Sequence, residues 1–70
     1  MRTETFTYYV IEHHCEIFGT MYYNDGLYEV DINEATEYGV QKLAEYDIKK
    51  HNLTNCNVVP VQKIFKIGQI

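Results

Sequence analysis

The segment DINEATEYGVQKLAEYDIKKHNL, residues 31–53, decides the fold because it alone combines a helical period, suitable ends and sufficient length. Its start offers a short polar side chain followed three positions later by an acid, a pair that satisfies free backbone amides. Its end carries cations that suit the negative end of the helix dipole, and a residue that tolerates left-handed backbone. These residues are Asp31 or Asn33 as N-cap with Glu34, and then Lys49, Lys50, His51 and Asn52.

The helix predicted from this segment has one face suited to packing. At about 100° per residue, one stripe collects most of its apolar side chains, with Asp47 beside them near the last turn. The stripe consists of Thr36, Val40, Leu43, Ala44, Ile48 and His51. Since the rest of the chain is typical of strands, we expect this helix to cover one face of a small antiparallel sheet.

Three strand-like runs precede the helix, and they are rich in Thr, Tyr, Phe and Val. Asp25-Gly26, between the second and third runs, predicts a two-residue type I′ turn. This turn places Tyr22 opposite Glu29, whereas a three-residue turn would place Met21 opposite Glu29 and mix polar and apolar faces. The runs span residues 3–12, 15–23 and 27–32.

The connection between the first two runs has no Gly, Pro or Asn. A turn at His13-His14 is preferred, and one long strand bent at Gly19 is the alternative. The preferred turn gathers a helix-facing set: Phe6, Tyr8, Val10, Cys15, Ile17, Met21, Tyr28, Val30 and Ile32. It leaves the opposite set facing outward: Thr5, Thr7, Tyr9, Ile11, Glu16, Phe18, Thr20, Tyr22, Glu29 and Asp31.

A fourth strand is predicted over residues 56–67, after the helix. Pro60 cannot donate to a ladder, so this strand is expected at an edge or at a bulge. We expect it to run parallel to the third strand, beside either the third or the first. The sequence therefore predicts a single α+β domain, residues 1–70, with two layers: a mostly antiparallel four-stranded sheet in the order β-β-β-α-β and one helix.

The net charge of −4 and its distribution favour a basic protein as partner. Residues 1–35 carry seven acids against Arg2 alone, which disfavours nucleic acid because DNA and RNA require clustered cations. The start MRTETFTYY lacks the apolar stretch of a secretion signal, and no apolar run is long enough for a membrane span. We therefore expect a cytoplasmic protein in which Cys15 and Cys56 are reduced.

The residues that could support chemistry do not form a recognisable site. Ligands acceptable to zinc are present, but their spacing differs from that of structural zinc sites, so no metal is expected. The chain has no serine, and neither a Cys-His pair nor the acids Glu29 and Asp31 come with the pocket that catalysis requires. We predict no enzymatic activity and no cofactor. The metal-ligand candidates are His13, His14, Cys15, His51 and Cys56.

The outward sheet face is the most informative surface, because large apolar and aromatic side chains on an uncovered face commonly mark protein contacts. The predicted partner-binding residues are Tyr9, Glu16, Phe18, Tyr22, Glu29 and Asp31, with Tyr38 and Tyr46 added from the helix. In size, charge and layout the chain resembles the small acidic inhibitors that phages carry against host defence, anti-CRISPR proteins included. The resemblance implies an acidic surface that occupies a basic nucleic-acid site. The alternatives are a homodimeric accessory protein that associates through the Tyr-rich face or an edge strand, and a zinc- or nucleic-acid-binding module.

Overall fold

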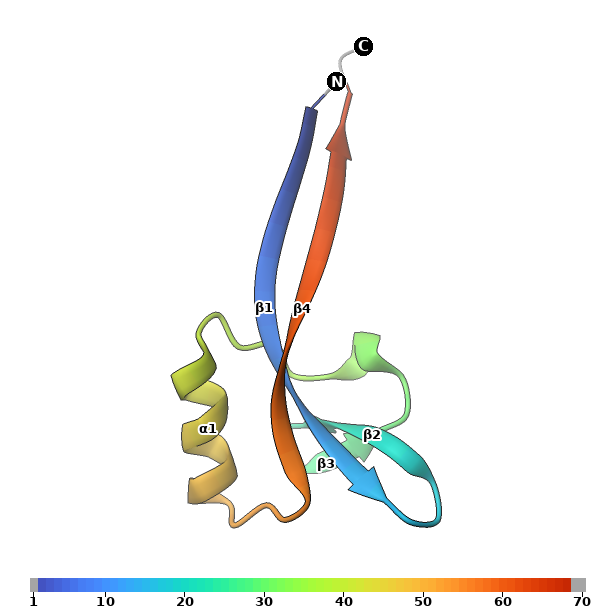
Figure 1. The fold of residues 1–70 in the computed structure, drawn as a ribbon, viewed down its shortest axis with the longest axis vertical. Helices are drawn as coiled ribbons and strands as arrows, with labels where there is room; N and C mark the ends of the chain where they lie inside the picture. Colours follow the sequence, from blue (N-terminus) through green and yellow to red (C-terminus); the bar gives the residue numbers. More distant parts are fainter. Residues whose placement is uncertain (1, 69–70) are drawn as a thin grey trace.

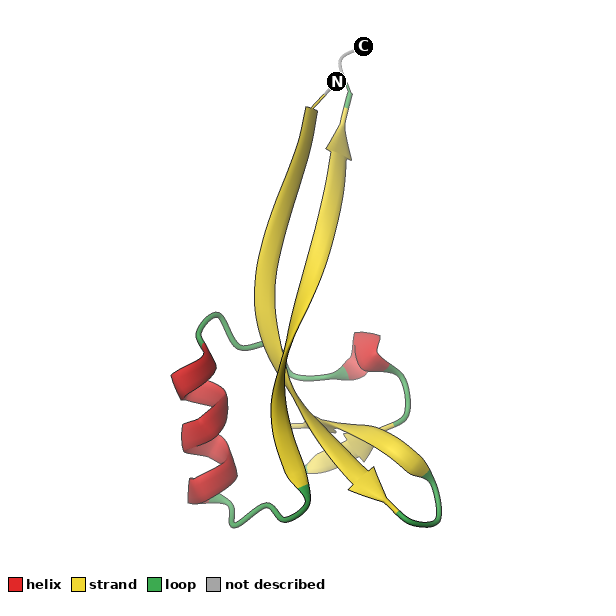
Figure 2. Cartoon of the chain, in the orientation of Figure 1, coloured by secondary structure: helices red, strands yellow, loops and turns green. Residues whose placement is uncertain are grey.

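The computed structural model describes residues 2–68 and has the predicted element order, with one additional short 3-10 helix. Figure 1 shows the chain as a ribbon, and Figure 2 separates helices, strands and loops. The fold is a small α+β domain with a four-stranded antiparallel sheet and one α-helix. The elements are β1 (Arg2–Cys15), β2 (Gly19–Asn24), β3 (Leu27–Glu29), η1 (Ile32–Glu34), α1 (Gln41–Lys50) and β4 (Cys56–Ile67).

The strands lie in the order β3-β2-β1-β4, and each pairs with its neighbours in antiparallel fashion. The last strand therefore lies beside the first, one of the two predicted places, but the prediction that it runs parallel to β3 is wrong. Residues 35–40 return across the sheet in extended form before α1 begins, which adds a reversal of chain direction. Pro60 sits on an edge strand, as predicted, opposite Tyr9.

The predicted turn at Asp25-Gly26 is confirmed. Both residues have positive φ, 44° and 93°, and the hairpin pairs Tyr23 with Tyr28 and Tyr22 with Glu29. Strand β3 ends at Glu29, three residues earlier than expected, because the chain bends into η1.

The predicted turn at His13-His14 is wrong, and so is the alternative of a single strand bent at Gly19. Strand β1 continues through both histidines to Cys15, and the turn lies at residues 16–18 before Gly19, whose φ is 77°. Side chains alternate along a strand, so this shift in the turn moves every β1 side chain to the sheet face opposite the one predicted, with β2 as the reference. Tyr9 and Ile11 consequently lie toward the helix, and Phe6, Tyr8 and Val10 lie on the opposite face, here called the outer face.

The helix is shorter than predicted, because its first ten residues form other structure. Asp31 does act as a cap, but for η1, where its side chain accepts a hydrogen bond from the Asn33 amide at 2.9 Å. Gly39 disfavours helix by about 1 kcal/mol. Meanwhile Tyr38 exchanges two backbone hydrogen bonds of 2.8 Å with Tyr9. The end of the helix is as predicted, with Asn52 in left-handed backbone at φ 52°.

The core lies between α1 and the sheet. Ile11 and Ala44 are fully buried, and Tyr23 and Tyr38 are nearly so. Ala44 and Ile48 of the predicted helix stripe pack here, whereas Val40 and Leu43 are exposed. Six further side chains pack against this cluster: Tyr9, Tyr28, Ile48, Leu53, Cys56 and Val58. Val10 is also fully buried, on the outer face.

The molecule is elongated because β1 and β4 continue as a pair far beyond the other strands (Figure 1). Its axes measure 47 × 26 × 16 Å, and its radius of gyration is 14.2 Å. A compact chain of this length would have a radius of gyration of about 11 Å. We call this two-stranded extension, residues 2–8 with residues 61–67, the arm.

Candidate functional site

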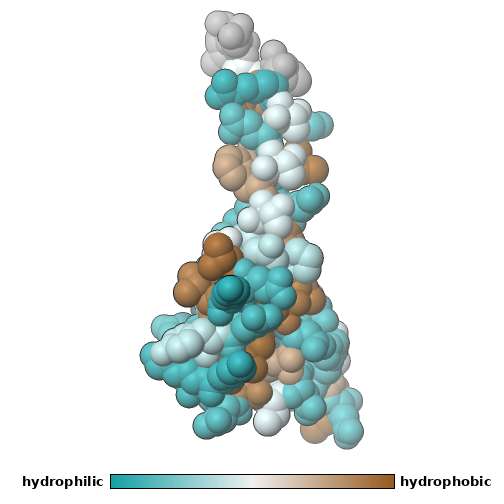
Figure 3. All heavy atoms as spheres, turned by 60° about the vertical axis from the view of Figure 1, so that its left-hand side comes forward, coloured by the Kyte–Doolittle hydropathy of each residue, from teal (hydrophilic) through white to brown (hydrophobic). Residues whose placement is uncertain are grey.

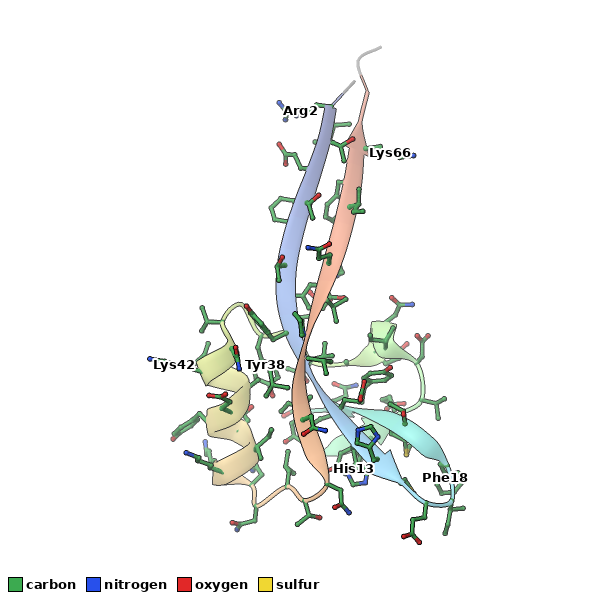
Figure 4. The ribbon with its side chains drawn as sticks, viewed as in Figure 1. Arg2, His13, Phe18, Tyr38, Lys42 and Lys66 are labelled. Carbon is green, nitrogen blue, oxygen red and sulfur yellow. The ribbon has the colours of Figure 1, made fainter. Side chains whose placement is uncertain are left out.

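The structure does not bring the predicted contact residues together on one surface. Tyr22 and Glu29 are neighbours on the outer face, as predicted. Tyr9 packs against the core, and Tyr38 is only 8% exposed, so the prediction that both lie on an exposed face is wrong. The others are exposed but dispersed: Glu16 and Phe18 in the loop after β1, Asp31 at the start of η1, and Tyr46 on α1. Figure 4 shows Phe18 at the opposite end of the molecule from the tip of the arm.

Tyr38 contacts both α1 and β1, which was not expected from its position in the sequence. Its hydroxyl donates a hydrogen bond of 2.6 Å to Asp47 of α1, while its backbone pairs with Tyr9 of β1. Burial and the hydrogen bond to the Asp47 carboxylate raise the pKa of the Tyr38 phenol above its ordinary value. Tyr38 therefore joins the helix to the sheet.

The outer face carries an acidic row across three strands, formed by Glu12, Tyr22 and Glu29. The register places Glu12 directly opposite Tyr22, and Tyr22 directly opposite Glu29. Neighbouring strands lie about 5 Å apart, so Glu12 and Glu29 extend from the backbone on either side of Tyr22, each one strand spacing away. All three side chains are half-buried, and Glu12 also pairs with His14 at 3.2 Å. Glu12 was missed because the misplaced turn ended the first strand there.

The arm exposes large apolar side chains, and one of them, Phe6, was predicted to face the helix. Phe6 and Phe65 pack edge to face with ring centroids 5.4 Å apart, yet remain 52% and 48% exposed. Ile67 and the half-buried Tyr8 and Val61 lie on the same face. In Figure 3, hydrophobic side chains lie among polar ones along the arm. The other face of the arm is largely polar, with Thr3, Thr5, Thr7, Gln62, Ile64 and Lys66.

The base of the arm is held by a charged contact. Lys63 donates a hydrogen bond of 2.5 Å to Glu37, and its ammonium lies 4.9 Å from the centre of the Tyr8 ring. The hydrogen bond to the carboxylate is the main reason that the pKa of Lys63 is raised. These groups connect the arm to the segment that precedes α1.

His13 and Cys56 form the one contact between the candidate metal ligands that the described residues show. His13 Nδ1 lies 3.0 Å from the Thr54 carbonyl oxygen and 3.5 Å from Cys56 Sγ. The His13 ring stacks on Tyr28 at 4.3 Å. Burial, followed by the hydrogen bond to Cys56, raises the pKa of Tyr28 to about 12. Both cysteines are free, and residues 2–68 contain no group of three or more His, Cys, Asp or Glu side chains arranged to hold a metal ion.

Charge separates along the long axis of the molecule. The arm has three cations, Arg2, Lys63 and Lys66, against the single carboxylate of Glu4. Figure 4 shows Arg2 and Lys66 near its tip. The rest of the chain carries nine carboxylates against three lysines. One end of the molecule is thus basic and apolar, and the other is acidic.

Within residues 2–68, none of the helices combines the length and the apolar character that a membrane span requires. No protein-family model, curated protein or solved structure matches the chain.

Proposed function

We propose that this protein is a small, non-catalytic protein-binding module whose acidic row contacts a basic surface of a partner protein. The observation that supports this function is the arrangement of Tyr22 between Glu12 and Glu29. A guanidinium group can stack on a tyrosine ring while a carboxylate accepts its paired hydrogen bonds. The row places a tyrosine ring and carboxylates on adjacent strands, about one strand spacing apart. It therefore suits an arginine of the partner.

The surroundings of the acidic row support the same class of partner. Asp25, Asp31 and Glu34 are exposed on the segments that follow β2 and β3, and the net charge outside the arm is strongly negative. Such a field attracts basic partners and increases the rate of encounter more than the final affinity. Tyr22 would act as the desolvated anchor of the contact, with the carboxylates fixing its orientation.

A basic surface of this kind is also what a nucleic-acid-binding enzyme presents to its substrate. The acidic row would then compete with a phosphate backbone for the same arginines. Together with the resemblance in size and charge to phage-borne anti-CRISPR proteins, this gives the proposal its concrete form: an inhibitor of a host defence nuclease complex. We place such an inhibitor in the cytoplasm, where its free cysteines would remain reduced.

The test compares what the immobilised chain captures from the cells that produce it, using two matched double variants. In Tyr22→Ala with Glu29→Lys, an aromatic ring and a carboxylate are removed from the acidic row. In Tyr46→Ala with Glu45→Lys, the same groups are removed from the exposed surface of α1, on the other side of the sheet.

We expect the wild type and the α1 variant to capture a nucleic-acid-binding protein that an oligonucleotide releases in competition. The row variant should lose at least tenfold in affinity for that protein and should retain its circular dichroism spectrum. Equal capture by the row variant, or capture that an oligonucleotide does not reverse, would contradict the proposed function.

A further inference from the structure

The edge of β1 along the arm has backbone groups available for another strand. Strand β2 pairs only with residues 12–15 of β1, and Tyr38 occupies the same edge at Tyr9. Among the described residues, no strand pairs with this edge between Arg2 and Tyr8. Strand β4 occupies the other edge throughout, in a register without interruption from Arg2 to His13.

The contact at Tyr9 shows which backbone groups point toward the open edge. The amide and the carbonyl of Tyr9 both bond to Tyr38, on the side away from β4. Residues two apart in a strand direct these groups to the same side. Thr3, Thr5 and Thr7 therefore present their amides and carbonyls outward, while Glu4, Phe6 and Tyr8 direct theirs to β4.

The outer edge of β4 is protected in a way that the edge of β1 is not. By the same alternation, Pro60, Gln62, Ile64 and Lys66 of β4 face outward, and Pro60 has no amide hydrogen to offer. Proline and lysine on an edge strand discourage the pairing of a further strand. The open stretch of β1 contains neither, and its outward-directed residues are β-branched threonines.

We propose that two copies of the chain pair in antiparallel fashion through this edge of β1, about a two-fold axis at Thr5. The ladder places Thr3 opposite Thr7 of the second copy and Thr5 opposite Thr5. It provides about six backbone hydrogen bonds and joins the two arms into a four-stranded sheet, β4-β1-β1-β4. A two-stranded ribbon is marginally stable in water, and a wider sheet is more stable.

For a second copy of the chain as the partner, the charges and the length of the open edge select this register. An axis at Glu4 would set Glu4 against Glu4, which is unfavourable. An axis at Phe6 would bring Thr3 to Tyr9 of the second copy, whose backbone groups are already bonded to Tyr38. The axis at Thr5 uses all of residues 2–8 and sets Arg2 opposite Tyr8 and Glu4 opposite Phe6. The threonine side chains, which would pair with one another on the face of the arm opposite Phe6 and Tyr8, also favour an antiparallel ladder.

This inference is independent of the proposed function, since the acidic row lies outside the arm and remains accessible in the dimer. Its test is the mass of the purified chain in solution, measured by sedimentation over a range of concentrations. We expect a dimer that dissociates on dilution. Thr5→Pro removes an outward amide without removing a bond to β4, and should weaken the dimer by about 10- to 100-fold. Ile64→Pro, the matched change at the cross-strand neighbour on the β4 edge, should leave it intact.

Oppositely charged substitutions at Thr5, on the two-fold axis, keep the test decisive if a proline variant fails to fold. Thr5→Lys and Thr5→Glu each set like charges against each other, so each variant alone should be a monomer where the wild type is a dimer. Mixed in equal amounts, they should recover a dimer of one copy of each. A wild type that remains monomeric at about 100 µM, or single variants that dimerise like the wild type, would overturn the proposal.

Discussion

Tyr38 is the residue at which the helix, the sheet and the connection between them meet. Its backbone extends the sheet beside Tyr9, and its hydroxyl reaches Asp47 in the last turns of α1. A short helix without a side-chain N-cap gains little stability by itself. The position of α1 therefore depends on contacts of this kind with the sheet.

Replacement of Tyr38 by Phe should lower the free energy of unfolding by about 1–2 kcal/mol, because it removes a hydrogen bond to a half-buried carboxylate while the ring remains. Tyr46→Phe is the matched control, since that hydroxyl lies on the exposed surface of α1. Urea unfolding followed by circular dichroism measures both variants. Equal stability of the two would show that the Asp47 contact contributes nothing measurable.

The same substitution should change the alkaline limit of stability. The pKa of Tyr38 is raised in the folded protein, and that of Tyr28 is raised to about 12, whereas tyrosines in an unfolded chain titrate near pH 10. The stability from these two phenols is fully present below about pH 10 and is lost as the pH rises through their folded values. Stability should thus fall above about pH 10, and less steeply in Tyr38→Phe than in Tyr46→Phe.

Gly19 explains why the first turn could not be predicted from the sequence. The turn at His13-His14 was preferred because it gathers an apolar helix-facing set, but the observed loop before Gly19 contains Ile17 and Phe18, and both are exposed. The reversal occurs there because Gly19 adopts positive φ at little cost. This displacement of the turn moved Tyr9 from the predicted contact face into the core. The pairing of Tyr22 with Glu29 was predicted correctly, because it depends on the next turn.

At the level of elements, the β2–β3 hairpin has the clearest local sequence signal for its turn. Asp25 and Gly26 both adopt the positive φ that a type I′ turn requires, and the Asp25 amide donates to the Thr36 hydroxyl at 3.2 Å. The helix boundaries were less predictable. The end of α1 follows local signals at Lys49, Lys50 and Asn52. The start of α1 depends instead on the distant pairing of Tyr38 with Tyr9.

Gly26→Ala should lower the free energy of unfolding by about 1–2 kcal/mol, because a Cβ atom is strained at a φ of 93° even with open space around it. Gly39→Ala provides the control, since its Cβ would also meet open space and its backbone lies outside the left-handed region. That change should be neutral or slightly stabilising. A loss of stability in Gly39→Ala as large as in Gly26→Ala would contradict the assignment of the cost to backbone strain.

At the scale of the whole molecule, the arm differs from residues 9–60, here called the body, in its charge and in how much of it packs against other elements. The body has a core between α1 and the sheet, whereas the arm has two strands and the exposed Phe6–Phe65 contact. Regions with few buried contacts open locally more often than the rest of a protein. If the arms pair, each gains neighbours without any change in the body, so the two parts should respond differently to protein concentration.

Amide hydrogen exchange, read residue by residue by NMR, can detect that difference. In the dilute monomer, the outward amides of Thr3, Thr5 and Thr7 lack partners and should exchange rapidly, while Glu4 and Phe6 are slowed by their bonds to β4. Where the dimer forms, the three threonine amides should become protected, because each then donates to the second copy. Ile64 and Lys66 on the outer edge of β4 should exchange rapidly at every concentration. Protection that arises at Ile64 and Lys66 instead would place the dimer contact on β4, and unchanged exchange at the threonines would exclude pairing through β1.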